Sequence, residues 1–128
     1  MNTVTENPFR LDGKTALITG GGSGLGFGIA QCFVSSGARV MIAGQSEAKL
    51  VVAVEQLGES ASYHVADVTD ADAAKGLIDA CSAQFGTLDI LINNAGTHVK
   101  KPYLEMTDDD VQSVLDVHVL SAFRLSKL

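Results

Sequence analysis

Residues 16–26 read Ala-Leu-Ile-Thr-Gly-Gly-Gly-Ser-Gly-Leu-Gly, an apolar run that breaks into glycines and decides the fold of this chain. The pattern predicts a strand, a tight turn and the start of a helix. The first N–H groups of a helix have no partner inside it, and the helix dipole places partial positive charge there. Because glycines carry no β-carbon to hold an anion away, a pyrophosphate can approach this main chain closely. The spacing Thr19-Gly20-x-x-x-Gly24-x-Gly26, in the first strand-to-helix turn, favours this interpretation over a plain glycine-rich turn.

A second motif lies at residues 88–96. Leu-Asp-Ile-Leu-Ile at 88–92 has the composition of a short strand in a buried parallel sheet. Asn93-Asn94-Ala95-Gly96 follows it directly. Side-chain amides at the end of such a strand can tie neighbouring loops together.

Predicted strands and helices alternate along the chain, which indicates an α/β protein with parallel strands joined by helical crossovers. The expected strands span residues 14–19, 39–43, 62–66 and 88–92. The expected helices span residues 24–36 and 46–57, a stretch capped by Thr69 that runs to about Phe85, and a last helix from Thr107. No repeat or linker divides the sequence, so we expect a single domain over residues 1–128.

The last helix opens with Thr107-Asp108-Asp109-Asp110, an N-cap hydroxyl and three carboxylates in the turn where the dipole favours negative charge. Capping accounts for these aspartates better than a metal site does. From there Val111, Leu115, His118 and Ala122 recur at helical spacing on one face. We therefore expect His118 to point in the same direction as core residues.

Composition excludes several classes of protein. Hydrophobic residues make up 46% and charged residues 19% of the chain, which favours a globular protein over a disordered one. A net charge of -6 without a basic patch argues against nucleic-acid binding. The N-terminus has no apolar run of signal-peptide length, and no segment is long enough to span a membrane, so we expect a cytoplasmic protein. Two cysteines without a CxxC motif, both in apolar helical patterns, indicate neither a metal site nor a disulfide framework.

Three motifs together resemble the short-chain dehydrogenase/reductase family: the glycine turn at 19–26, Asp67-Val68 after the third strand, and the Asn-Asn-Ala-Gly run at 93–96. The resemblance runs from about Leu11 to Leu128. It implies a Rossmann-type, doubly wound parallel sheet with strand order 3-2-1-4 in this chain, which ends before the family's fifth strand.

The resemblance also implies a set of residues that bind a dinucleotide cofactor. The pyrophosphate side is implied at Gly20, Gly24 and Gly26, with Ser23 and Leu25 lining the same turn. Thr19 corresponds to the threonine that ties this turn to neighbouring backbone. Asp67 and Val68 correspond to the adenine contact, although a surface carboxylate is the alternative for Asp67 by itself. Asn93, Ala95 and Gly96 correspond to the segment beside the nicotinamide ribose, and Asn94 to a structural amide.

Cofactor choice depends on the end of the second strand, where a carboxylate binds the ribose 2′-hydroxyl of NAD and a basic residue accepts the 2′-phosphate of NADP. This chain has Gly44-Gln45-Ser46 there, with neither group. Ser46 and Lys49 could contact a 2′-phosphate, whereas Glu47 would oppose it. The sequence therefore slightly favours NADP(H) over NAD(H).

The family's catalytic Ser and Tyr-x-x-x-Lys would lie beyond Leu128. Tyr63 and Tyr103 do not replace them, because Asp67 and Thr107 stand four residues later. His118 occupies the position where most members carry the Asn of the catalytic tetrad, and it is the catalytic candidate of this chain. A histidine satisfied within the core is the alternative.

We therefore expect this chain to be the cofactor-binding half of an NAD(P)-dependent oxidoreductase. The whole enzyme would transfer hydride between nicotinamide and a carbonyl or alcohol, whereas this half is expected to be inactive by itself. Segments 9–14 and 101–105 resemble members that act on sugar acids and polyols, such as gluconate 5-dehydrogenases. A non-catalytic nucleotide-binding or interaction module is the alternative. The apolar strand at 88–92 would form a free sheet edge, which predicts a homo-oligomer.

Overall fold

The computed structural model describes residues 7–128, which form a four-stranded parallel sheet. Its strands are β1 (Thr15–Thr19), β2 (Arg39–Gly44), β3 (Ala61–Val65) and β4 (Ile90–Ile92). The order is β3-β2-β1-β4, so the predicted parallel sheet and its strand order are confirmed. Residues 1–6 of the predicted domain lie outside the described residues.

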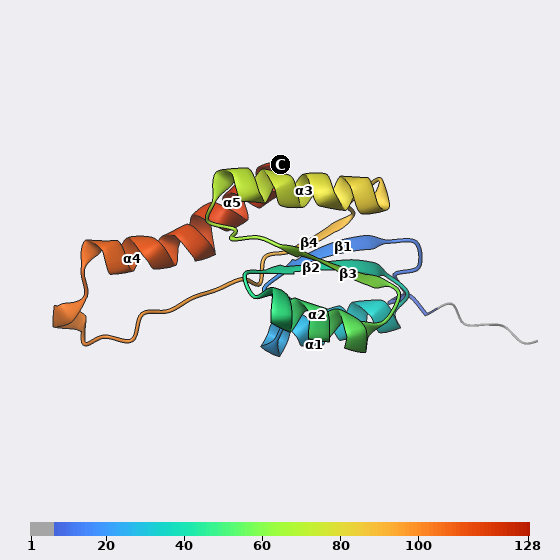
Figure 1. Ribbon diagram of the computed structural model, residues 1–128, viewed down its shortest axis with the longest axis horizontal. Coiled ribbons are helices and arrows are strands. Elements are labelled where there is room, and N and C mark those ends of the chain that lie inside the picture. The colour runs from blue at the N-terminus through green and yellow to red at the C-terminus, as the bar shows by residue number, and fades with distance from the viewer. Residues whose placement is uncertain (1–6) are drawn as a thin grey trace, which may run out of the picture.

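Helices cover both faces of the sheet. The helices α1 (Gly24–Ser35) and α2 (Glu47–Leu57) lie on one face, and α3 (Ala71–Phe85) and α5 (Ser121–Lys127) lie on the other (Figure 1). Side chains of β1 alternate between the two layers, as successive residues of a strand must. Ala16 and Ile18 belong to the core cluster with α1 and α2, whereas Leu17 packs with Leu77 and Leu125.

The edge strand β4 is shorter than the sequence predicts. Its ladder begins at Ile90 rather than Leu88, because the Asp89 carboxylate accepts the Thr15 N–H at 2.9 Å, where a backbone carbonyl would otherwise accept it. Within residues 7–128, β4 pairs with β1 alone, and its three residues are half-buried. The predicted free edge is therefore present in the described chain.

Side-chain caps fix where two of the helices begin. Asp70, not Thr69, caps α3, because its carboxylate accepts the Ala73 N–H at 2.9 Å, so the prediction of a Thr69 cap is wrong. The predicted cap at Thr107 is confirmed for α4 (Asp108–Leu115). The Thr107 hydroxyl accepts the Asp110 N–H at 3.1 Å, and the Asp110 carboxylate accepts the Thr107 N–H at 3.0 Å.

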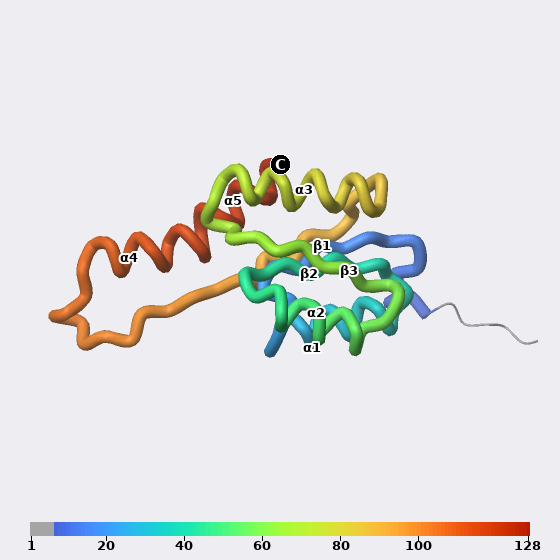
Figure 2. The backbone as a smooth tube through the Cα atoms, in the orientation of Figure 1, coloured from blue at the N-terminus to red at the C-terminus, as the bar shows by residue number. Residues whose placement is uncertain are grey.

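The helix α4 and the segment that leads to it, residues 93–107, extend away from the sheet in the same direction (Figure 2). The short 3-10 helix η1 (Tyr103–Glu105) lies on this segment, and the π-helical turn η2 (Asp116–Leu120) connects α4 to α5. Because α4 projects beyond the sheet, no part of the described core covers the apolar face of α4 that the sequence predicts to be buried. Val111 and Leu115 on that face are 48% and 44% exposed in the described chain. The expectation that His118 points into a core is wrong for the same reason, since its side chain is exposed.

No helix within residues 7–128 combines the length and the apolar composition needed to cross a membrane.

Candidate functional site

The turn after β1 requires glycine at each of the three motif positions. Gly20 and Gly24 have φ values of 65° and 58°, in the left-handed region that favours glycine. A β-carbon on Gly20 would also lie 3.0 Å from Nδ2 of Asn94. A β-carbon on Gly26 would collide with the carbonyl oxygen of Gly20. These are the three glycines of the sequence motif, and each is required by the backbone itself.

The N-terminus of α1 differs from those of the other capped helices. Ser46, Asp70 and Thr107 each accept a hydrogen bond at the start of α2, α3 and α4. Ser23, the N-cap of α1, makes no such bond within the described part of the chain. The first N–H groups of α1 therefore remain available to an anion, and the dipole of this helix favours negative charge there.

Two side chains join the turn after β1 to the turn after β4. The buried Thr19 hydroxyl accepts the N–H groups of Asn94 and Ala95 at 3.1 and 3.0 Å. The Asn94 amide donates to the carbonyl oxygen of Gly20 at 3.1 Å. The amide thus ties the two loops together, as its position after the strand indicates.

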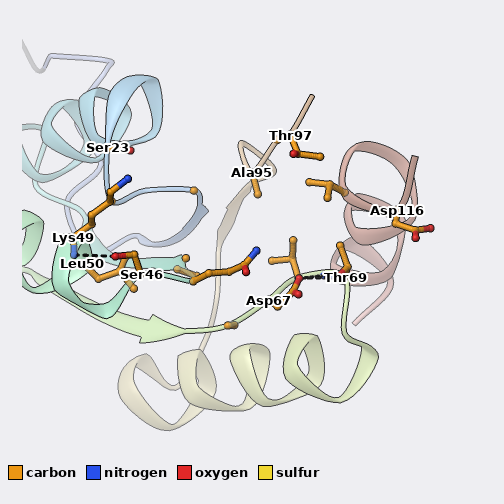
Figure 3. Close-up of a pocket in the computed structure, with 18 of the residues that line it drawn as sticks. Ser23, Ser46, Lys49, Leu50, Asp67, Thr69, Ala95, Thr97 and Asp116 are labelled. Atoms are coloured by element: carbon orange, nitrogen blue, oxygen red, sulfur yellow. Dashed lines mark hydrogen bonds between the residues drawn. The ribbon is translucent and has the colours of Figure 1, made fainter. Parts of the chain in front are cut away.

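A cavity of about 560 Å³ opens at the carboxyl ends of the four strands (Figure 3). This volume lies within the range of small-molecule and cofactor sites. It brings together eight of the predicted residues: Gly20, Ser23, Gln45, Ser46, Asp67, Val68, Ala95 and Gly96. Six others lie outside its lining: Thr19, Gly24, Leu25, Gly26, Asn93 and His118. Of these, Leu25 is 83% exposed on α1.

The cavity also has lining residues that sequence reasoning missed. Among them are the polar residues Thr69, Thr97, Ser113 and Asp116, and also Val117. Thr69 and Thr97 directly follow motif residues, so adjacency in the sequence could have identified them. The other three come from α4 and η2. No sequence motif indicates that these two elements approach the cavity.

The end of β2 and the start of α2 form one wall of the cavity. Gln45, Ser46 and Lys49 line it, and the Ser46 hydroxyl accepts the Lys49 N–H at 3.5 Å (Figure 3). Glu47 lies outside the lining, where its carboxylate accepts a hydrogen bond from the Tyr63 hydroxyl at 3.1 Å. This hydrogen bond and the charge of Glu47 raise the pKa of Tyr63.

The turn after β3 presents a carboxylate whose orientation is fixed on one side. Asp67 Oδ1 accepts both the N–H of Thr69 at 2.9 Å and its hydroxyl at 2.7 Å (Figure 3). The other oxygen, Oδ2, has no hydrogen-bond partner among the described residues. Val68 beside it is buried and packs in the core. The turn can therefore offer a carboxylate oxygen to a ligand that carries an N–H or O–H group.

His118 contacts the segment after β4 from η2. Its Nε2 lies 3.1 Å from the backbone nitrogen of Thr97 and 2.8 Å from the carbonyl oxygen of the same residue. A β-carbon on Gly96 would come within 2.8 Å of the imidazole Cε1, so this close approach depends on glycine. The ring thus contacts the segment of Gly96 and Thr97, and His118 is not among the residues that line the cavity.

Comparison with known proteins identifies relatives along nearly the whole chain. The 2,3-dihydroxy-2,3-dihydro-p-cumate dehydrogenase of Pseudomonas putida is 33% identical over 100% of this chain and 51% of its own length. D-threitol dehydrogenase of Mycolicibacterium smegmatis is 36% identical over 90% of this chain and 45% of its own length.

The crystal structure of 3-ketoacyl-(acyl-carrier-protein) reductase from Brucella melitensis, complexed with NADH, superposes with a TM-score of 0.86. It is 31% identical and is matched over 91% of this chain and 48% of its own. The chain therefore spans about half the length of these relatives. The family model described as short chain dehydrogenase matches residues 14–128, and the chain belongs to the short-chain dehydrogenase/reductase family.

Proposed function

We propose that this chain forms the dinucleotide-binding part of an NAD(P)-dependent oxidoreductase. The observation that carries the proposal is the cavity at the strand ends, which opens beside the three required glycines and the α1 N-terminus that no side chain caps within the described residues. Phosphate groups bind at helix N-termini of this kind. The relative solved with NADH has the same fold over most of this chain, which supports a nicotinamide dinucleotide as the ligand.

The residues present fit such a cofactor in three places. The main chain of Gly20, Gly24 and Gly26 would hold the pyrophosphate, with Ser23 and Leu25 lining the same turn. Thr19 would support the turn through its hydrogen bonds to the backbone of Asn94 and Ala95. Asp67 and Val68 would receive the adenine. Asn93, Ala95 and Gly96 would lie beside the nicotinamide ribose. When bound, the nicotinamide supplies the hydride chemistry, and the protein supplies binding and orientation.

We propose NADP(H) as the slightly favoured cofactor. Gln45, Ser46 and Lys49 line the cavity where the ribose 2′-position would lie, and Lys49 supplies a positive charge there. Glu47, the carboxylate that would oppose a phosphate, lies outside the lining and is held by Tyr63. Comparing the Kd values for NADPH and NADH by fluorescence titration tests this choice. Tighter binding of NADPH is expected, and a clear preference for NADH would overturn it.

The substrate we propose is a carbonyl compound or an alcohol, with polyols and sugar acids as the first class to assay. The similarity to D-threitol dehydrogenase supports a polyol. A carbonyl acceptor needs a general acid within hydrogen-bond reach. This chain does not contain the family's proton donor. His118, at the tetrad position of the family, is the catalytic candidate that it does contain, and its role would be that of a relay through the Thr97 backbone.

The second candidate function is a nucleotide-binding or interaction module without catalysis. Neither tyrosine of the 128-residue sequence is followed by a lysine four positions later, which favours this alternative for the chain by itself. Incubating the chain with reduced cofactor and a panel of carbonyl substrates separates the two functions. Binding of cofactor without its oxidation supports the module, and substrate-dependent oxidation supports an enzyme.

A further inference from the structure

The Asp67 carboxylate is held by two donors from a single neighbour. The N–H and the hydroxyl of Thr69 both donate to Oδ1 of Asp67, at 2.9 and 2.7 Å. A carboxylate with both donors on one oxygen cannot rotate freely, so Oδ2 keeps a defined direction. This orientation depends on where the backbone of Thr69 lies.

A second element fixes the backbone of Thr69. The Arg124 guanidinium of α5 donates from Nη1 to the carbonyl oxygen of Thr69 at 3.2 Å, in a partly buried contact. The next residue of α5, Leu125, is 2% exposed and belongs to the same core cluster as Val68. The helix is therefore anchored beside the turn, and Arg124 connects it to the residue that holds Asp67.

We infer that Thr69 and Arg124 are positioning residues that orient the Asp67 carboxylate toward the base of the bound dinucleotide. The inference rests on the proposed function, in which Asp67 faces the adenine. The free Oδ2 would accept a hydrogen bond from the exocyclic amine of adenine. The hydrogen bonds from Arg124 to Thr69 and from Thr69 to Asp67 keep that oxygen in a fixed orientation. The turn thereby favours a base that carries a hydrogen-bond donor at the position of the adenine amine over a base that carries a carbonyl oxygen at the same position.

A role confined to folding is the competing explanation for the contact between Arg124 and Thr69. That role predicts a lower melting temperature for variants but no change in base selectivity. The test therefore compares two ligands on each protein, NADH and reduced nicotinamide hypoxanthine dinucleotide. The hypoxanthine base presents a carbonyl oxygen where adenine presents its amine. Because the ratio of the two Kd values is taken within one protein, changes in stability cancel.

Four variants of the full chain test these hydrogen bonds. Thr69→Val removes the hydroxyl donor with little change of shape, and Thr69→Ser keeps it. Arg124→Met removes the guanidinium, and Lys127→Met removes a positive charge from the same helix as a matched control. A hydrogen bond to a charged group corresponds to about tenfold or more in affinity, so we expect the wild-type chain to favour the adenine ligand by about tenfold.

The expected result is that Thr69→Val and Arg124→Met each lower this ratio to about threefold or less, whereas Thr69→Ser and Lys127→Met keep it. Unchanged selectivity in Thr69→Val and Arg124→Met would overturn the inference, and Thr69→Val decides this even where Arg124→Met unfolds. A wild-type chain that binds both ligands equally would also overturn it, while leaving nucleotide binding intact. A chain that binds neither of these ligands nor NADPH would overturn the proposed function itself.

Discussion

At the scale of single residues, backbone geometry distinguishes glycines that look alike in the sequence. Gly24 and Gly28 both have open space where a β-carbon would lie, yet only Gly24 of the two has a positive φ. Gly24 lies at the start of α1, where a bound phosphate would approach the main chain. Gly28 lies further along the same helix.

The pair gives a matched prediction for cofactor binding. Gly24→Ala is expected to weaken dinucleotide binding by about tenfold or more, because the side chain disfavours the left-handed backbone and occupies the approach to the amides. Gly28→Ala is expected to leave the Kd within about twofold, since it alters a helix interior where alanine is favoured. Isothermal titration with NADPH measures both. Equal affinities in the two variants would contradict the assignment of the turn.

The two cysteines should differ in reactivity. Cys81 is fully buried in the core, and burial raises the pKa of its thiol to about 11. Cys32, by contrast, is exposed on α1. Since the thiolate is the reactive form, we expect iodoacetamide at pH 8 to modify Cys32 and to spare Cys81 in the folded chain. Mass spectrometry of tryptic peptides checks this, and equal labelling before unfolding would show that the core is open.

At the scale of elements, hydrogen bonds to Asp110 connect the start of α4 to the segment that precedes it. The Asp110 carboxylate accepts from Lys101 Nζ at 2.8 Å and from the Thr107 N–H at 3.0 Å. These hydrogen bonds, the one from Lys101 first, lower the pKa of Asp110 below its usual 3.8. A carboxyl group whose pKa is lower in the folded state stabilises it above the unfolded pKa, and this contribution is lost as pH falls through the folded value.

We therefore expect Asp110→Asn to lower the Tm at pH 7 and the difference from wild type to shrink below about pH 4. Asp109→Asn is the matched control, because it removes a carboxylate from the same first turn. Asp109 makes no side-chain hydrogen bond among the described residues. Thermal unfolding followed by circular dichroism from pH 7 to pH 3 measures both variants. A Tm difference for Asp110→Asn that does not vary with pH would contradict a stabilising role for the ionised Asp110 carboxylate.

Local sequence patterns predict some of the helices and strands and their caps, but not how each element is covered. The glycine turn, the Thr107 cap and the strand order follow from the sequence because glycine chemistry, N-capping and the alternation of elements are local or nearly local properties. Asp70 displaced Thr69 as the cap of α3, because both residues can cap and Thr69 is engaged by Asp67. Helical periodicity identified the apolar face of α4, but it carries no information about what covers that face.

At the scale of the whole molecule, the described chain leaves apolar surface uncovered. The strand β4 has one open edge within residues 7–128, and the helices beyond it expose Val119 and Phe123 by 55% and 66%. Open sheet edges and apolar patches favour association with other chains. The sequence predicted the open edge, and the family resemblance also implied that the last helix would lose its cover in this chain.

We expect this chain to self-associate when isolated, as the proposed homo-oligomer requires. Sedimentation velocity across a range of concentrations should show dimers or larger species, and Phe123→Glu should shift them toward monomer by placing a charge on the exposed face. Gln31→Glu adds the same charge at an exposed position of α1, on the opposite face of the sheet, and should leave the distribution unchanged. A stable monomer at high concentration would contradict the expectation.

In the function proposed for this chain, the backbone amides at the start of α1 bind the pyrophosphate of a dinucleotide. Two-dimensional 1H–15N NMR of the labelled chain, titrated with NADPH, tests it most directly. The largest saturable chemical-shift changes should fall on the amides of residues 23–26. Saturable binding that leaves these four amides unmoved would contradict it.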